Sequence, residues 1–293
     1  MGNKERIAFI VNPVSGTGKQ RNIVRQIEEY LDHDKYDATI LYTSYAHHAV
    51  RIAQEVVDEG FPNLVAVGGD GSINDCVQNV IGSDVNFGII PLGSGNGLAR
   101  HLKIPLKIKD AIQVINRQNT MGIDTVSINN RIYVSIAGIG FDAQVAREFA
   151  FSSIRGFQTY FRIIFQTYPF YEPITYRLEV DGEEMSKKAL FISFANSNQF
   201  GYNTEVAPKA QLDDGLLDIC IVKKVPLPMV FWTAQLLFTK QFEKSMYVQT
   251  IQAKDIKVFN NQGGWVNVDG EPMKLGEELH LKILPQSLRV IVP

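Results

Sequence analysis

The sequence has few cysteines and no long apolar run. Only two of its 293 residues are cysteine, Cys76 and Cys220, and they lie far apart without the spacing of metal ligands. This argues against a disulfide framework or a zinc site and makes a reducing compartment the default. No stretch of about 18 uninterrupted apolar residues occurs, so we expect no membrane span and a cytoplasmic location.

The sequence also lacks an excess of either charge. Lys and Arg number 29 and Asp and Glu number 31, for a formal net charge of -2. This argues against nucleic acid as the main partner, because a basic surface usually supplies the non-specific affinity. Hydrophobic residues make up 45% of the chain, enough for one large domain or two ordinary ones with a core.

What the sequence does contain is two glycine loops close together. Gly-Gly-Asp-Gly at residues 68–71 follows an apolar run at 64–67, and Gly-Ser-Gly-Asn-Gly at residues 93–97 follows another at 87–90. Helix-compatible sequence follows each loop, so backbone N–H groups and helix dipoles could hold a polyphosphate. Asp70 would repel phosphate, and we therefore expect it to hold a metal ion or a proton.

Short apolar strands alternate with amphipathic segments in the first half, which predicts βαβ units and a parallel sheet. Ligands bind at the carboxyl ends of such strands. The residues expected at those ends are Asn12, Thr43, Gly68 and Gly93. Their convergence is a stronger indication of a site than any single motif.

Beyond about residue 125 the pattern favours an antiparallel sandwich or barrel-like domain. The segment 176–180 alternates with period two, and Asp181-Gly182 after it predicts a hairpin turn. Helical signal shrinks to the segments 143–167 and 228–242. The other expected strands are 132–136, 190–194, 217–222, 256–259, 265–268, 279–283 and 288–292.

Two familiar nucleotide motifs do not fit. Residues 12–19 lack the glycine spacing of a P-loop, and Gln20 follows Lys19 where Ser or Thr is required, although a phosphate-facing glycine turn remains the prediction. The loop at 93–97 lies on the fourth strand, and no acid ends the next strand to bind a ribose. A dinucleotide fingerprint is therefore rejected.

Several acidic and aromatic patterns have two interpretations. Asp269-Gly270-Glu271-Pro272 and Asp213-Asp214-Gly215 could be turns, or carboxylates for catalysis and for Mg²⁺. His47 and His48 are predicted to be surface histidines. The aromatic segments 149–171 and 226–242 would pack in the core, or would form an acyl-chain slot at a bilayer surface.

These motifs together resemble the bacterial diacylglycerol-kinase-like lipid kinases, which are related to sphingosine and ceramide kinases. Residues 12–16, 68–74 and 91–96 are similar to the three nucleotide loops of that family. Asp124 and the segments 138–142, 212–215 and 269–271 occur in family order. The resemblance covers nearly the whole chain.

The resemblance implies a Rossmann-like ATP-binding domain at residues 1–125, with a returning strand at 286–293, and a lipid-binding β-sandwich at 126–285, as in NAD and diacylglycerol kinases. The active site would lie in the cleft between them. It implies Mg²⁺ at Asp214, with the carbonyls of Gln211 and Leu216, linked toward Asp124. The ATP-binding residues it implies are Asn12, Pro13, Ser15, Gly16, Thr43, Gly68, Gly69, Asp70, Gly71, Ser72, Asn74, Gly93, Ser94 and Asn96.

The expected activity is transfer of the ATP γ-phosphoryl group to a lipid hydroxyl. Asp269 and Glu271 match the catalytic carboxylate of the family, and Asp70 matches the base of its sphingosine branch, so all three are candidates. Gly97 stands where diacylglycerol kinases commonly have Asp, which leaves diacylglycerol or a sphingoid lipid open as acceptor. Homodimer formation and contact with the inner face of the plasma membrane also stay open.

Two other functions are weighed against lipid phosphorylation. A kinase for a soluble substrate is one, because Gly-Gly-Asp-Gly also occurs in NAD kinases and phosphofructokinases. The other is a non-catalytic nucleotide- or lipid-binding protein. The aromatic second half and the third loop favour a lipid acceptor, and the presence of every candidate carboxylate favours catalysis.

Overall fold

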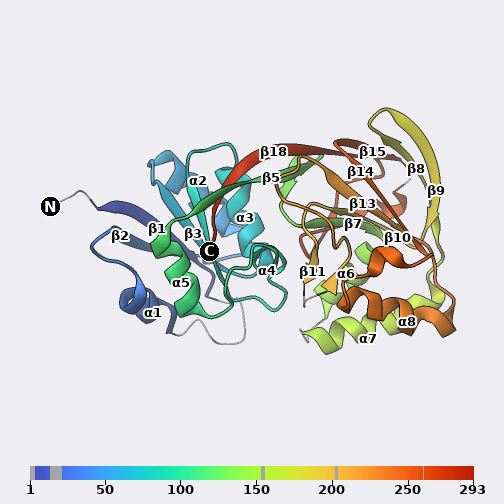
Figure 1. Cartoon of the computed structure of the whole chain (residues 1–293), viewed down its shortest axis with the longest axis horizontal. Coiled ribbons are helices and arrows are strands. Elements are labelled where there is room, and N and C mark those ends of the chain that lie inside the picture. The colour runs from blue at the N-terminus through green and yellow to red at the C-terminus, as the bar shows by residue number, and fades with distance from the viewer. Residues whose placement is uncertain (1–3, 14–21, 153–155, 202–203, 260) are drawn as a thin grey trace. The chain divides into compact units, whose positions relative to one another are not determined.

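The computed structural model describes residues 4–13, 22–152, 156–201, 204–259 and 261–293 (Figure 1). The chain forms two compact units. The N-terminal unit comprises Met1–Ile123 and Gln286–Pro293, and the C-terminal unit comprises Asp124–Pro285. Asp124 and Thr125, which the sequence placed in the first domain, therefore belong to the second unit.

The N-terminal unit is built on a parallel sheet in the order β2-β1-β3-β4. All six residues of β3 are buried, as expected of a strand covered by helices on both faces. The strands are β1 (Glu5–Val11), β2 (Tyr36–Tyr42), β3 (Asn63–Gly68) and β4 (Asn86–Pro91). The helices are α1 (Ile23–Tyr30), α2 (His48–Asp58), α3 (Asp70–Val80), α4 (Gly97–His101) and α5 (Ile108–Arg117).

The helices of this unit form two layers, with α2 and α3 on one face of the sheet and α1 and α5 on the other (Figure 1). Register aligns the strand ends. Val11 pairs with Tyr42 on one side and with Val67 on the other, and Gly68 pairs with Pro91. The loops that follow these strands therefore leave the sheet along one edge, as the alternating pattern predicted.

The last strand serves both units. The sequence predicted two strands, 279–283 and 288–292, but β18 (Leu279–Ile291) is continuous. Its first residues pair antiparallel with β15 (Asp255–Phe259) in the C-terminal unit, and Val290 pairs parallel with Phe87 of β4 in the N-terminal unit. The break expected between the two strands is a backbone irregularity at Gln286, whose φ is 47°.

The C-terminal unit is an antiparallel sandwich, as predicted. One sheet orders β14-β13-β10-β7-β16-β17, and the other contains β18, β15, β8 and β9 with β5 and β6 alongside. The side chains between them form its largest core. These strands are β5 (Thr120–Ile128), β6 (Arg131–Tyr133), β7 (Ile136–Gly140), β8 (Ile174–Val180), β9 (Glu183–Ala189), β10 (Phe191–Ala195), β13 (Leu217–Val222), β14 (Val248–Ala253), β16 (Trp265–Val268) and β17 (Glu271–Lys274).

The predicted turn at Asp181-Gly182 is confirmed. Val180 pairs with Glu183 across it, and both turn residues have positive φ, at 48° and 89°, as a type I′ turn requires. A short ribbon, β11 (Gln199–Gly201) with β12 (Thr204–Glu205), and the 3₁₀ turns η3 (Phe242–Lys244) and η4 (Gln262–Gly264) complete the loops.

Three helices follow in this unit: α6 (Phe141–Phe151) packs on the six-stranded sheet, α7 (Phe157–Thr167) packs on α6, and α8 (Leu227–Phe238) packs through Leu236 and Leu237 on the core beside β10 and β13. The 3₁₀ turn η2 (Tyr168–Phe170) extends α7. The sequence predicted one helical segment at 143–167, but α6 ends at Phe151 and α7 begins only after Gly156, whose φ of 116° no helix accommodates. Figure 1 shows α7 and α8 alongside each other.

Candidate active site

The two glycine loops of the N-terminal unit touch each other through their backbones. A Cβ atom on Gly93 would lie 2.6 Å from the Cα atom of Gly69, and one on Gly69 would lie 3.1 Å from the Cα atom of Gly93. Gly93 has no room for a side chain, and a Cβ atom on Gly69 would press tightly against backbone. The glycines are therefore required by this close approach, and the loops after β3 and β4 form one surface.

Asp70 joins the same two loops by hydrogen bonds. Its carboxylate accepts the backbone N–H of Asn96 at 2.8 Å and that of Gly97 at 2.7 Å. Asn96 has a left-handed φ of 52°, and its side chain donates to the carbonyl of Gly93 at 2.8 Å. Asp70 thus fixes the third loop, a contact that the expectation of a metal or proton at this carboxylate did not include.

Other predicted nucleotide residues lie at the same sheet edge. The side chain of Asn12 donates to Ser72 Oγ at 3.3 Å, and the N–H of Thr43 donates to the carbonyl of Val11 at 3.0 Å. Ser72 lies in the first turn of α3, where N–H groups have no partner within the helix. Asn74 is buried and Ser94 is exposed. Ser15 and Gly16 lie outside the described residues.

The sequence did not predict the contact between His47 and Asp75 at this edge. His47 was predicted to be a surface histidine, and its side chain is half exposed, but its Nδ1 lies 3.0 Å from Asp75 Oδ1 of α3. His47 also has a φ of 60°. No local pattern relates these residues, because they belong to different βα units and meet only when α2 packs on α3.

In the C-terminal unit, Asp124 holds the predicted metal loop. Asp124 is fully buried, and its carboxylate accepts the N–H of Gly215 at 2.7 Å. Asp214 is exposed and accepts the N–H of Leu216 at 3.0 Å. The side chain of Asp124 therefore contacts the backbone of the loop that carries Asp214.

The residues predicted to bind metal offer oxygen only. Within the described ranges, no group of three His, Cys, Asp or Glu side chains forms a metal cluster. The exposed carboxylate of Asp214 and the backbone carbonyls of Gln211 and Leu216 nevertheless lie on one loop that Asp124 anchors. Carboxylate and carbonyl oxygens are the donors that Mg²⁺ prefers, so this set fits that ion.

The structure places Asp269 at a hairpin turn. Asp269 and Gly270 have φ values of 48° and 89°, and Val268 pairs with Glu271 across them. The carboxylate of Asp269 accepts three backbone N–H groups, from Val134 at 3.0 Å, Ser135 at 2.9 Å and Ile136 at 3.0 Å. The turn interpretation of these letters is therefore confirmed, and this carboxylate organises the strand beside it.

A buried amide links Asp269 to Asp124. The side chain of Asn196 donates to the carbonyl of Asp124 at 2.9 Å and to that of Val134 at 2.8 Å, while the N–H of Val134 donates to Asp269. Sequence analysis did not single out Asn196, since an Asn after a strand resembles any turn residue. Glu271 lies just beyond, at the start of β17, and is partly exposed.

The Gly-x-Gly-Phe-Asp segment has a packing explanation. Asp142 in the first turn of α6 presses against Gly138, where a Cβ atom would overlap its carboxylate. The side chain of Asn267 donates to Asp142 at 3.0 Å. Burial raises the pKa of Asp142 to about 6, and the hydrogen bond from Asn267 opposes that shift.

Fold and sites together define a class of protein. An α/β unit with glycine loops at its strand ends, followed by an antiparallel sandwich, is the architecture that diacylglycerol kinases share with NAD kinases. Residues 6–128 match the model of the diacylglycerol kinase catalytic domain. Residues 135–292 match that of the YegS C-terminal NAD kinase beta sandwich-like domain.

The chain belongs to the diacylglycerol-kinase-like lipid kinase family of bacteria, as its motifs indicated. A diacylglycerol kinase of Staphylococcus saprophyticus is 28% identical over 296 residues, which cover 99% of this chain and 96% of the relative. One of Staphylococcus aureus is 29% identical over 272 residues, which cover 92% and 86%.

Solved structures share the fold. The crystal structure of a diacylglycerol kinase from Bacillus anthracis has a TM-score of 0.78 at 20% identity, covering 100% of this chain and 98% of the other. No helix in the described part of the chain is long and apolar enough to cross a membrane. Asp70 belongs to the N-terminal unit, and Asp269 and Glu271 belong to the C-terminal unit.

Proposed function

We propose that this kinase transfers the γ-phosphoryl group of ATP to a hydroxyl group of a lipid, such as diacylglycerol or a sphingoid or other acylglycerol-type lipid. The observation that carries the proposal is the contact of Gly69 with Gly93, reinforced by Asp70. This contact holds the two glycine loops together, so that their backbone N–H groups form one surface of hydrogen-bond donors. Phosphoryl transfer depends mainly on positioning the phosphates, which such a surface would do.

The nucleotide would bind along the strand ends of the N-terminal unit. Gly71 and Ser72 in the first turn of α3 provide N–H donors and the positive end of the helix dipole. Because its carboxylate already accepts two N–H groups, Asp70 places less uncompensated negative charge beside the phosphates. We assign Asp70 the role of a positioning residue.

We assign the general base to Glu271. The carboxylate of Asp269 accepts three backbone N–H groups in a buried turn, whereas Glu271 is partly exposed on β17. In the reaction, the acceptor oxygen forms a bond to the γ-phosphorus as the bond from phosphorus to the β,γ-bridging oxygen breaks. The proton of the lipid hydroxyl passes to the Glu271 carboxylate, and ADP leaves.

A divalent ion would be held by Asp214 and the carbonyls of Gln211 and Leu216. When bound, such an ion offsets negative charge in the region that Asp124 anchors. Asp124 orients this loop through Gly215, and Asn196 connects it to the strand that Asp269 organises. This chain of contacts gives the C-terminal unit a fixed frame for Glu271.

The acceptor is tested by incubating the protein with γ-labelled ATP and separate acceptors, then separating products by thin-layer chromatography. The acceptors are diacylglycerol, sphingosine, ceramide, NAD and fructose 6-phosphate. Label in a lipid supports the proposal and names the acceptor class. Label only in NAD or the sugar phosphate, or nucleotide binding without transfer to any acceptor, overturns it.

A further inference from the structure

The outer surface of α8 is apolar where a water-soluble helix would be polar. The helix contains no charged residue, and its sequence is Leu-Pro-Met-Val-Phe-Trp-Thr-Ala-Gln-Leu-Leu-Phe. A helix that is apolar all round is normally buried on every side. Here Thr233 is the only buried residue, whereas Phe231 is 65% and Trp232 is 68% exposed.

The apolar surface continues onto α7. Phe238 of α8 stacks on Phe161 at a centroid distance of 6.5 Å, and Phe161 lies 6.2 Å from the ring of Phe165. Phe165 is exposed, and Phe170 of η2 is 85% exposed. We call this surface the α7–α8 face. Its exposed apolar members are Phe165, Phe170, Leu227, Met229, Phe231, Trp232, Phe238 and Met246.

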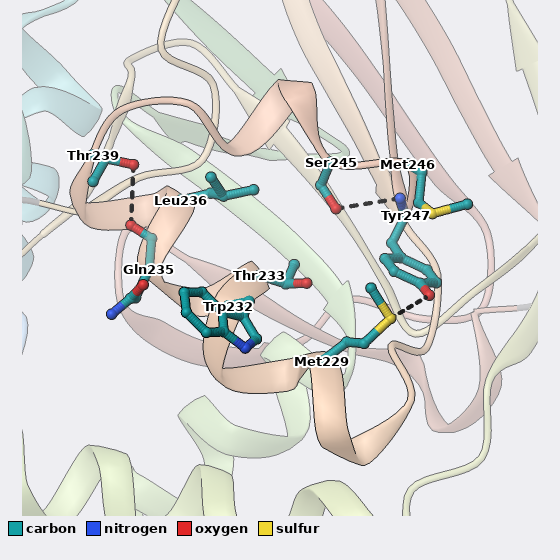
Figure 2. Close-up of a pocket in the computed structure, with 9 residues that line it drawn as sticks. All are labelled: Met229, Trp232, Thr233, Gln235, Leu236, Thr239, Ser245, Met246 and Tyr247. Carbon is teal, nitrogen blue, oxygen red and sulfur yellow. Dashed lines mark hydrogen bonds between the residues drawn. The ribbon is translucent and has the colours of Figure 1, made fainter.

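A groove of about 350 Å³ runs beside α8 within this face (Figure 2). Met229, Trp232 and Leu236 line it from the helix, and Met246 and Tyr247 line it from the segment that follows η3. The hydroxyl of Tyr247 donates to the sulfur of Met229 at 3.2 Å. The groove gives the face a recess in which apolar chains could lie.

The charged residues that flank α8 are mostly positive. Residues 223–247 contain four lysines and one glutamate in a chain whose net charge is -2, and α7, η2 and α8 contain no Asp or Glu. Lys224 pairs with Glu172 at 3.3 Å, and Lys240 pairs with the buried Glu205 at 2.8 Å.

Two of the four lysines remain without an acidic partner. Among the described residues, neither Lys223 before α8 nor Lys244 after it makes an ion pair, and both are exposed. Cations at both ends of an apolar helix, with Trp and Phe between them, match the anionic headgroups and acyl boundary of a phospholipid bilayer.

A second copy of the chain fits this face less well. In a symmetric dimer the same surface meets itself, and α8 has lysines beyond both ends. Parallel or antiparallel pairing of two α8 helices would therefore bring like charges together. Neither α7 nor α8 contains an acidic side chain that would offset these positive charges.

We infer that the α7–α8 face docks the protein on anionic phospholipid bilayers, with α8 lying in the plane of the interface. The inference goes beyond the proposed reaction, since it rests on exposure and charge in the C-terminal unit alone. Docking would keep the kinase at the surface where a lipid acceptor resides.

The first test measures co-sedimentation with vesicles of phosphatidylcholine and phosphatidylglycerol, without ATP or acceptor. The double variant F231S/W232S should reduce partitioning roughly tenfold or more. The matched control is L106S, which removes an exposed leucine of the N-terminal unit and should bind like the wild type. Circular dichroism should show unchanged unfolding, because both aromatic side chains are already exposed.

The second test uses tryptophan emission. The chain has two tryptophans, so W265F leaves Trp232 as the sole reporter. Vesicles should shift its emission to shorter wavelength, and lipids brominated on the acyl chain should quench it. Emission that does not change when the protein co-sediments with vesicles would place the contact elsewhere and overturn the inference.

The third test addresses charge. K223Q/K244Q should weaken binding to anionic vesicles roughly tenfold, whereas K188Q/K282Q removes the same charge from exposed strand positions and should change it little. About 1 M salt should weaken wild-type binding, since it shortens the Debye length to about 3 Å.

Three outcomes overturn the inference. They are absence of vesicle binding, equal binding by wild type and F231S/W232S, and an effect of that variant only on particle mass in analytical ultracentrifugation, which would make the face an interface between copies. Vesicle binding is read without turnover. Docking can therefore fail while lipid phosphorylation stands, and the reverse also holds.

Discussion

The carboxylate of Asp70 lies 2.7 Å from the backbone nitrogen of Gly97, in the loop that follows the neighbouring strand. A second bond, to the N–H of Asn96, makes the contact bidentate. An acid between the two glycine loops is thus explained as the side chain that fixes their spacing.

Replacing Asp70 with Asn should weaken nucleotide binding as well as turnover. An amide offers one acceptor oxygen for two N–H groups and turns its own NH₂ toward one of them. Hydrogen bonds to charged groups contribute about 1.5–3 kcal/mol, so the Kd for ADP should rise roughly tenfold to a hundredfold. Isothermal titration measures it. Unchanged ADP affinity with lost turnover would instead make Asp70 the base.

Replacing Gly93 with Ala should destabilise the N-terminal unit. The new methyl group would lie 2.6 Å from the Cα atom of Gly69, so backbone must move, which costs about 1–3 kcal/mol. G71A is the control, because no atom lies within 4 Å of its Cβ position. Urea denaturation should show a lower midpoint for G93A only. Equal midpoints would contradict the close approach.

Replacing Glu271 with Gln should reduce turnover by roughly 10²–10⁴ and leave stability unchanged, as expected for a general base. Asp269→Asn should instead lower stability. It disturbs a carboxylate that accepts three buried N–H groups, so the unfolding free energy should fall by about 1–3 kcal/mol. Rate measurements and denaturation on both variants separate the roles. Wild-type turnover in E271Q would exclude it as base.

Asp142 should make the protein less stable as pH rises. Its pKa in the folded state is about 6, above the ordinary value of 3.8, so the folded chain binds the proton more tightly. The stabilisation is complete below pH about 4 and is lost as pH rises through 6. Asp142→Asn should remove this slope and raise the melting temperature at neutral pH, with Asn267 Oδ1 available to accept its NH₂. An unchanged slope would contradict the assignment.

Removal of Mg²⁺ should reveal whether Asp214 holds it. An ion at a hundred times its Kd stabilises the folded state by about 2.7 kcal/mol. EDTA should therefore lower the melting temperature of the wild type and have little effect on Asp214→Asn. Asp213→Asn is the matched control on the same loop. Equal EDTA sensitivity in all three proteins would move the metal elsewhere.

The parallel sheet and its loops could be predicted because their signals are local. β3 and β4 are short buried runs, and a glycine loop follows each directly, so glycines after residues 67 and 92 had to share an edge. The contact of Asp70 with Gly97 could not be predicted, because it depends on how two neighbouring loops pack. His47 and Asp75 were missed for the same reason.

Other features stayed open or were predicted wrongly because one sequence pattern serves two structures. Asp269-Gly270 reads equally as a hairpin turn and as a catalytic carboxylate, and the positive φ values with the pairing of Val268 and Glu271 showed the turn. Pro285 and Gln286 interrupt the apolar alternation, so one strand was predicted as two. β18 is nevertheless continuous, with a positive φ at Gln286 that spacing alone does not reveal.

The shared strand β18 has a consequence for the order in which the protein becomes stable. It follows every other strand in the described chain, yet it pairs with β4 in one unit and with β15 in the other. During synthesis, neither β4 nor β15 can pair with β18 until β18 has left the ribosome. The apolar edge of β4 therefore stays unpaired until then, and the N-terminal unit, although synthesised first, cannot be completed first.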